Sequence, residues 1–134
     1  MAIDPDALMA RARECLDAAY APYSRFRVAA AVIDDRGRVF TGVNVENISY
    51  GLSMCAERVA IFSAIAGGAR RITALAVTSS GADLLSPCGA CRQVIAEFAA
   101  SDVPIFCEAA GKPHRWTVSE LLPDSFAASQ LGKG

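Results

Sequence analysis

The stretch from residue 55 to residue 107 alternates helix-type and strand-type patterns, and this alternation limits the possible folds more than any other feature of the chain. Residues 55–66 are apolar nearly all round, which indicates a helix buried on more than one side. Residues 72–78 are apolar on both alternating faces, as expected of an interior parallel strand. A helix over 88–98 and a strand over 103–107 follow, and such units join through right-handed crossovers that place helices on both faces of a sheet.

The part of the chain before residue 55 predicts one helix and one hairpin. Asp4-Pro5 is a helix start, because the aspartate can cap free N–H groups and a proline at the first position needs no N–H partner. The helical apolar spacing continues to about Tyr20. Residues 28–33 and 39–45 predict two strands, joined at the turn Asp35-Arg36-Gly37.

The remaining elements complete a single domain. A weak strand is expected near Trp116 and a short helix over 118–122. Because 134 residues fit one domain, we expect residues 1–134 to fold as a unit. The predicted fold class is α/β, a three-layer α/β/α sandwich with a mixed sheet of about five strands. Ligands of such sheets bind beyond the carboxyl ends of the strands, where the helices near Cys55 and Cys88 both begin.

The composition excludes several classes of function. Hydrophobic residues make up 53% of the chain, and 13 Lys+Arg against 14 Asp+Glu give a formal net charge of -1. These values exclude intrinsic disorder and argue against a nucleic acid polymer as partner, because phosphate binding favours a basic surface. No segment resembles a secretory signal or a membrane span. We therefore expect a cytoplasmic protein with a small-molecule ligand and no membrane partner.

The cysteines point to a metal site. Five cysteines in a reducing compartment favour metal binding or catalysis over disulfides. Cys88 and Cys91 face the same way at one helix start, and Cys55 at the other helix start can add a third thiolate. Three ligands leave one position of a tetrahedral Zn²⁺ site open, as in catalytic zinc sites. Glu57 is placed to move protons beside a water molecule at the ion, and the Arg58 guanidinium can donate to the thiolates.

Two other interpretations of the cysteines compete with this one. Cys88 and Cys91 alone could form a thioredoxin-like redox pair, although the third cysteine at the other helix start weakens that interpretation. A closed structural zinc site would need a fourth ligand from His114, Cys15 or Cys107. The two cysteines of this set lie on apolar faces and are expected in the core, and the histidine lies in a polar loop where we expect it to be solvated.

Several separate motifs in a fixed order resemble those of one enzyme family. They are Ala21-Pro22-Tyr23-Ser24-Arg25-Phe26, Asn44-Val45-Glu46-Asn47, Cys55-Ala56-Glu57, Pro87-Cys88-Gly89-Ala90-Cys91 and Leu121-Leu122-Pro123. Together they resemble the small homotetrameric zinc-dependent cytidine deaminases, in the three-cysteine form of the zinc-deaminase signature. The resemblance implies the cytidine deaminase-like fold. It also implies Zn²⁺-dependent hydrolysis of cytidine and 2′-deoxycytidine to uridine and 2′-deoxyuridine, with release of ammonia, in pyrimidine salvage.

The resemblance also implies roles for individual residues. It makes Glu57 the catalytic proton carrier at N3 of the base, Arg58 the residue that bonds the thiolates, and Cys55, Cys88 and Cys91 the zinc ligands. The implied substrate-binding residues are Phe26 against the pyrimidine, Asn44 and Glu46 on the ribose, Ala56 on the base, and Tyr50 and Phe126. The last two enter a neighbouring subunit's site in the family, which implies a homotetramer with shared active sites.

Three other functions remain open at this stage. A relative could act on a modified cytosine nucleoside such as blasticidin S, although Asn44 and Glu46 suit an ordinary ribose. The chain could also be a zinc-stabilised binding module without turnover. A polynucleotide deaminase is disfavoured by the charge balance and by the short chain.

Overall fold

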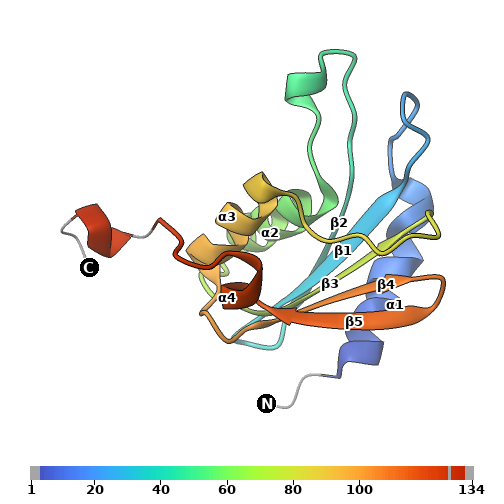
Figure 1. Cartoon of the computed structure of the whole chain (residues 1–134). Helices are drawn as coiled ribbons and strands as arrows, with labels where there is room; N and C mark the ends of the chain where they lie inside the picture. The colour runs from blue at the N-terminus through green and yellow to red at the C-terminus, as the bar shows by residue number, and fades with distance from the viewer. Residues whose placement is uncertain (1–3, 127, 132–134) are drawn as a thin grey trace.

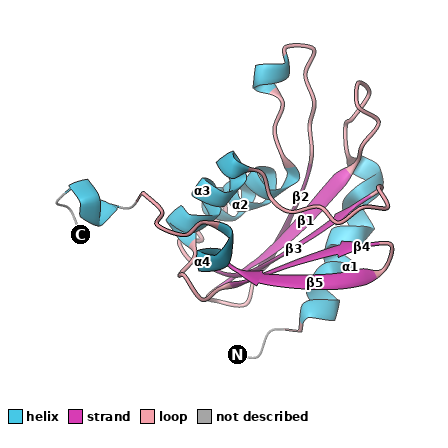
Figure 2. Ribbon diagram, in the orientation of Figure 1, coloured by secondary structure: helices cyan, strands magenta, loops and turns pink. Residues whose placement is uncertain are grey.

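A five-stranded sheet forms the centre of the protein, and helices cover both of its faces (Figure 1, Figure 2). The computed structural model describes residues 4–126 and 128–131. Its elements, with η for 3₁₀ helices, are in chain order α1 (Pro5–Cys15), η1 (Leu16–Ala18), β1 (Val28–Asp34), β2 (Val39–Val43), η2 (Tyr50–Leu52), α2 (Ala56–Ala66), β3 (Ile72–Ser79), α3 (Gly89–Phe98), β4 (Pro104–Ala109), β5 (Lys112–Thr117), α4 (Val118–Leu121) and η3 (Ala128–Leu131).

The sheet is mixed, with the strand order β2-β1-β3-β4-β5. The predicted hairpin is present, because β1 and β2 pair antiparallel from Ala29 opposite Val43 to Ile33 opposite Val39. The central strand β3 pairs antiparallel with β1 and parallel with β4. The weak strand expected near Trp116 is β5, which pairs antiparallel with β4. The predicted three-layer α/β/α architecture is therefore confirmed.

Small residues on the strands let the helices pack closely on each face. On one face, Leu8, Met9 and Ala12 of α1 pack against a cluster that includes Ala31, Ala74 and Ala76. On the other face, α2 and α3 form the larger core with β1, β3 and β4. The closest approach is at Gly42 of β2, where an added Cβ would lie 2.3 Å from the backbone nitrogen of Ala60 in α2. Only glycine fits there.

The helix ends follow the local chemistry of the sequence, with two corrections. Asp4 caps α1 through hydrogen bonds from the N–H groups of Asp6 and Ala7, as predicted. The first helix ends earlier than predicted, because the chain tightens into η1 before Tyr20. The third helix begins at Gly89, one residue later than predicted, with Cys88 as its N-cap residue.

Two segments extend away from the packed layers. The loop between β2 and α2 carries η2 and stands out from the sheet (Figure 1). The segment after α4 leaves the domain body and leads to η3 (Figure 1). Both carry large exposed apolar side chains, namely Val45, Ile48, Tyr50 and Leu52 on the loop, and Phe126 and Leu131 on the C-terminal segment. Among the described residues, no helix has the length and apolar character needed to span a membrane.

Candidate active site

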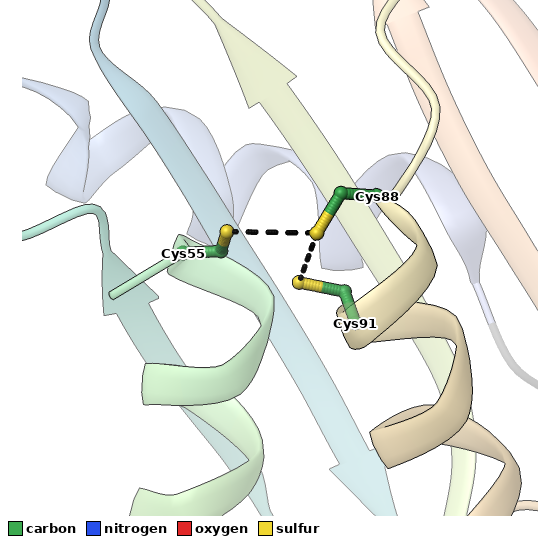
Figure 3. A group of neighbouring side chains, drawn as sticks. All are labelled: Cys55, Cys88 and Cys91. Carbon is green, nitrogen blue, oxygen red and sulfur yellow. Dashed lines mark hydrogen bonds between the residues drawn. The ribbon is translucent and has the colours of Figure 1, made fainter. Parts of the chain in front are cut away.

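The metal-ligand candidates meet because two helices begin at the same edge of the sheet. Helices α2 and α3 both start beyond the carboxyl end of β3, with Cys55 and Cys88 as their N-cap residues. Figure 3 shows the thiol groups of Cys55, Cys88 and Cys91 turned toward one another. The Sγ atoms of Cys55 and Cys88 are 3.8 Å apart, those of Cys88 and Cys91 are 3.5 Å apart, and all three lie within 4.8 Å of one another.

The charge distribution around the three sulfurs suits thiolates. The neighbouring Cys91 thiol is the largest cause that lowers the pKa of Cys55 to about 5, with Arg58 and Cys88 adding to the effect and burial opposing it. The pKa of Cys91 is raised in turn, chiefly because it serves as a donor to Cys55. Helix starts also favour negative charge. A divalent cation with an affinity for sulfur would replace the protons shared among these thiols, and zinc fits this donor set.

Arg58 neutralises part of that negative charge. Its Nη2 atom donates to the Cys55 sulfur at 3.4 Å, and this contact raises the pKa of the guanidinium. The Nε atom of Arg58 is buried and has no hydrogen-bond partner within the described part of the chain. The predicted contact between Arg58 and a thiolate is thus present in the structure.

Glu57 is a buried carboxyl group at the wall of a cavity beside the thiols. It is only 4% exposed, and burial is the main cause that raises its pKa above the ordinary range, with the charge at Cys55 adding to the shift. A carboxyl group with a raised pKa takes up a proton more readily than an ordinary carboxylate does, as a proton carrier must. The cavity measures about 270 Å³, close to the lower end of the range of small-molecule sites. Its lining residues are Phe26, Val28, Asn44, Glu46, Ser53, Met54, Cys55, Ala56, Glu57, Leu85, Ser86 and Cys88.

Asn44 and Glu46 reach this cavity while also holding the loop before β1. The Asn44 amide donates to the Phe26 carbonyl oxygen at 2.8 Å, and its oxygen accepts from the N–H of Val28 at 2.9 Å. The Glu46 carboxylate accepts from the N–H groups of Tyr23 and Ser24 and from the Ser24 hydroxyl. The contacts with Ser24 are the main cause that lowers the pKa of Glu46, so its charge is retained.

The structure does not bring Tyr50 or Phe126 to the cavity of their own chain. Tyr50 is 76% exposed and lies edge-on to the Tyr23 ring at a centroid distance of 6.3 Å, over a neighbouring hollow. Phe126 is 61% exposed on the C-terminal segment, where its carbonyl oxygen accepts from the Gln93 amide at 3.2 Å. Their expected entry into another subunit's site stays a prediction.

The residues weighed as a fourth ligand lie away from the three thiols. Cys107 is buried in the core under α2 and α3, while Cys15 lies on α1 across the sheet and is only partly buried. His114 lies on β5 rather than in the predicted loop; its side chain is exposed, as expected, and its ring is 4.2 Å from that of Trp116. Within residues 4–126 and 128–131, the metal-binding group consists of Cys55, Cys88 and Cys91 alone. Three protein ligands would leave one position of a tetrahedral zinc site for a ligand from outside the chain.

Sequence reasoning missed several residues that line the cavity. Ser53, Met54, Leu85 and Ser86 contribute to its wall. Met54 was detectable only by its place immediately before Cys55, since an apolar residue type carries no chemical signal. Leu85 and Ser86 belong to the loop that leads to Cys88, and neither side chain has the metal-ligating or acid–base chemistry that would have marked a site.

The fold and the site define an α/β/α protein with three converging cysteine sulfurs next to a buried carboxyl group. The sequence matches the family described as the cytidine and deoxycytidylate deaminase zinc-binding region over residues 3–107. This match covers most of the chain. The protein belongs to this zinc-binding family.

Characterised relatives resemble the chain over nearly its whole length. The cytidine deaminase of Sporosarcina psychrophila is 41% identical over 130 residues, which cover 96% of each chain. The cytidine deaminase of Halalkalibacterium halodurans is 43% identical over 130 residues, and the aligned residues cover 96% of this chain and 98% of the relative. The crystal structure of cytidine deaminase from Burkholderia pseudomallei superposes with a TM-score of 0.86 at 42% identity, covering 92% of this chain and all of its own.

Proposed function

We propose that the protein is a zinc-dependent hydrolase that deaminates cytidine and 2′-deoxycytidine to the uridine nucleosides, with release of ammonia. The observation that carries this proposal is that buried Glu57, Cys55 and Cys88 line one cavity, with the Cys91 sulfur close behind the other two sulfurs. The names of the relatives, which match nearly the whole chain, support the same activity. The entire chain acts as one domain in this reaction, and a role in pyrimidine salvage follows from the substrate.

Cys55, Cys88 and Cys91 are the proposed zinc ligands. Zinc held by these thiolates lowers the pKa of a water molecule and so supplies a nucleophile at neutral pH. Arg58 donates to the Cys55 sulfur and offsets part of the charge of three thiolates, which keeps the site electrophilic. Since thiolate ligands need reduced cysteines, we place the enzyme in the cytoplasm.

Glu57 is the proposed proton carrier. Protonation of N3 of the cytosine ring by Glu57 makes C4 more electrophilic and prepares it for attack by water. Glu57 takes the N3 proton from the attacking water, and the same carboxylate then carries the second proton of that water to the exocyclic amine, which leaves as ammonia. The burial of Glu57 and its raised pKa suit a group that takes and gives a proton twice in one turnover.

Substrate recognition is assigned to the remaining cavity residues. Phe26 packs on the face of the pyrimidine, and backbone atoms of Ala56 bond the base edge. The Asn44 amide N–H donates to the 3′-hydroxyl oxygen of the ribose, and the Glu46 carboxylate accepts from the hydroxyl hydrogen. Support for these roles comes from their shared position on the cavity wall and from the charge retained by Glu46.

The active form is proposed to be a homotetramer with shared active sites. The apolar side chains of the β2–α2 loop and of the C-terminal segment are exposed, and large exposed apolar groups favour interfaces. The helix predicted to be buried on more than one side, α2, still has Phe62 45% exposed. A second copy of the chain would cover these surfaces and place Tyr50 and Phe126 at a neighbour's cavity.

The direct test combines turnover with metal content. We expect purified protein to carry one zinc ion per chain and to lower the ultraviolet absorbance of cytidine as uridine forms. Removal of the metal by a chelator should abolish turnover, and added zinc should restore it. Cytidine, 2′-deoxycytidine, free cytosine, adenosine and blasticidin S should be compared in one panel. A protein that binds zinc and leaves all five unchanged would contradict the proposal and favour a binding module.

A further inference from the structure

Arg92 stands next to a metal-ligand candidate, and its guanidinium is shared among three separate acceptors. Its Nε atom donates to the carbonyl oxygen of Pro87 at 2.7 Å. Its Nη1 atom donates to the carbonyl oxygen of Leu121 at 2.9 Å, and its Nη2 atom donates to the hydroxyl of Ser86 at 3.1 Å. All three guanidinium nitrogens are therefore occupied by protein groups, although the side chain is half-buried and close to the protein surface.

Two of these acceptors belong to the loop that delivers a zinc ligand. Pro87 immediately precedes Cys88, and Ser86 lines the cavity. The backbone N–H of Arg92 also donates to the carbonyl oxygen of Cys88 at 2.9 Å, as the first turn of α3 requires. Arg92 thus holds the Ser86–Cys88 segment through both its side chain and its backbone.

The third acceptor belongs to a distant part of the chain. Leu121 is the last residue of α4, and the C-terminal segment that carries Phe126 starts directly after it. The next residue on α3, Gln93, donates to the carbonyl oxygen of Phe126 at 3.2 Å. One turn of α3 therefore contacts both the loop before Cys88 and the two ends of the Leu121–Phe126 segment.

We propose that Arg92 is a positioning residue for the deamination reaction, which ties the Cys88 loop and the origin of the Phe126 segment to one guanidinium. This inference rests on the proposed function. Arg92 touches neither the thiols nor the cavity residues proposed to bind the base. It acts through Pro87 and Ser86 on the metal loop, and through Leu121 on the segment that would reach a neighbouring subunit.

Arginine suits this position because its fork is planar and its donors are fixed relative to one another. Its donors sit on three separate nitrogens, and each of these nitrogens bonds a different acceptor here. A lysine ammonium on a flexible stem keeps the charge and bonds a smaller part of the set. Arg92→Lys is thus a variant that preserves charge and approximate length while loosening the link between the two segments.

Zinc release gives the first test, since it does not depend on turnover. The rate at which zinc-loaded protein transfers its metal to a coloured chelator should rise about 10- to 100-fold in Arg92→Lys, the range typical for residues that orient metal ligands. Arg11→Lys is the matched control, because Arg11 lies on α1 across the sheet and its ion pair with Glu14 is on the surface. Zinc release from Arg92→Lys at the rate of the parent would overturn the role of Arg92 at the metal loop.

Kinetics test the second half of the proposal. With zinc fully loaded, Arg92→Lys should raise KM for cytidine more than it lowers kcat, because the segment it holds carries Phe126, which is proposed to contact substrate in a neighbouring subunit and to take no part in proton transfer. In a Phe126→Ala background, Arg92→Lys should raise KM no further, since no aromatic ring remains to be positioned. If Arg92→Lys raises KM as much in the Phe126→Ala background as in the parent, Arg92 does not act through the segment that carries Phe126.

Two further results keep the test decisive. If Arg92→Lys does not fold, Ser86→Ala removes one acceptor only, and it should still speed zinc release relative to the parent. Unchanged release from Ser86→Ala would then count against the proposal. If the parent does not deaminate cytidine, the proposed function fails, whereas the zinc-release comparison still decides whether Arg92 positions the metal loop.

Discussion

The Asn44 amide donates to the Phe26 carbonyl oxygen across 2.8 Å, so the residue assigned to the sugar also fixes the residue assigned to the base. The Asn44 oxygen and the Glu46 carboxylate likewise have protein partners. Asn44 and Glu46 therefore have hydrogen-bond partners within the protein before a sugar hydroxyl binds. A substrate without this hydroxyl leaves no buried polar group of the protein unpaired. Because an unpaired buried group gives the strongest discrimination between substrates, we expect weaker discrimination at this site.

We expect a moderate preference for the 3′-hydroxyl. A hydrogen bond to a charged group contributes about 1.5–3 kcal/mol, which corresponds to roughly 10- to 100-fold in kcat/KM for cytidine over 3′-deoxycytidine. 2′-Deoxycytidine retains the 3′-hydroxyl and should be accepted. Steady-state kinetics with the three nucleosides measure this directly. Equal kcat/KM for cytidine and 3′-deoxycytidine would rule out the assigned contact.

Replacement of Glu57 by glutamine should separate proton transfer from metal binding. The amide keeps the size of the side chain in its buried position and removes the group that carries protons. We expect kcat to fall by about 10⁴-fold, the upper end of the usual range, because one group serves two transfers. Zinc content, measured by metal analysis, should match that of the parent. Comparable turnover, or loss of zinc, would show that Glu57 has another role.

Mixed assemblies can reveal whether Phe126 acts on a neighbouring chain. Glu57→Gln subunits lack the proton carrier and retain the aromatic ring, whereas Phe126→Ala subunits have the opposite defect. When the two are co-assembled, some sites combine Glu57 from one chain with Phe126 from another, so activity should exceed the sum of the separate variants. Native mass spectrometry confirms the mixing. Merely additive activity in mixed assemblies would place Phe126 on its own chain's cavity or outside catalysis.

The buried carboxylate of Glu108 should make stability depend on acid pH. It accepts hydrogen bonds from Arg13 at 2.8 and 2.5 Å and from Thr78 at 2.8 Å, and the contact with Arg13 is the main cause that lowers its pKa below 4.5. Because its pKa is lower folded than unfolded, Glu108 contributes stability above the unfolded value. That contribution is lost as the pH falls through the folded value.

Because the pKa of Glu108 is lowered in the folded state, the stabilisation should be present at neutral pH and lost in acid. At neutral pH, Glu108→Gln should lower the free energy of unfolding by about 1–2 kcal/mol, at the low end for a charged hydrogen bond because Arg13 is half exposed. Urea unfolding at a series of pH values should show the difference shrinking below about pH 4.5. Glu14→Gln, on the exposed pair with Arg11, is the control. If the difference in free energy of unfolding between the parent and Glu108→Gln stays constant with pH, Glu108 is not the group that makes stability depend on acid pH.

The sequence predicted the elements well because their signals are local. Asp4-Pro5 and the turn at Gly37 each determine their own backbone, so the first helix start and the hairpin lie where expected. The end of the first helix was wrong since Leu16–Ala18 continue as a 3₁₀ turn, and composition alone does not separate this turn from a helix. Cys55, Cys88 and Cys91 were brought together by topology, which the strand–helix alternation already implied.

The supporting part of the site was less accessible to prediction. Arg92 is bonded to carbonyl oxygens of Pro87 and Leu121, and a backbone acceptor has no signature in residue type. The same holds for the bonds that tie Asn44 to Phe26 and Val28. Such contacts depend on the distance between separate segments, so they become visible only in three dimensions.

The contact at Gly42 has a consequence for how this protein can change. Because an added Cβ would lie only 2.3 Å from Ala60 N and 2.8 Å from Ala56 O, any larger residue at position 42 would push β2 and α2 apart. Helix α2 carries Glu57 and Arg58 and follows Cys55 directly, so the reacting groups are anchored to the sheet. New substrate ranges, whether they arise by evolution or by engineering, should therefore come from the loops around the cavity, with Gly42 left unchanged.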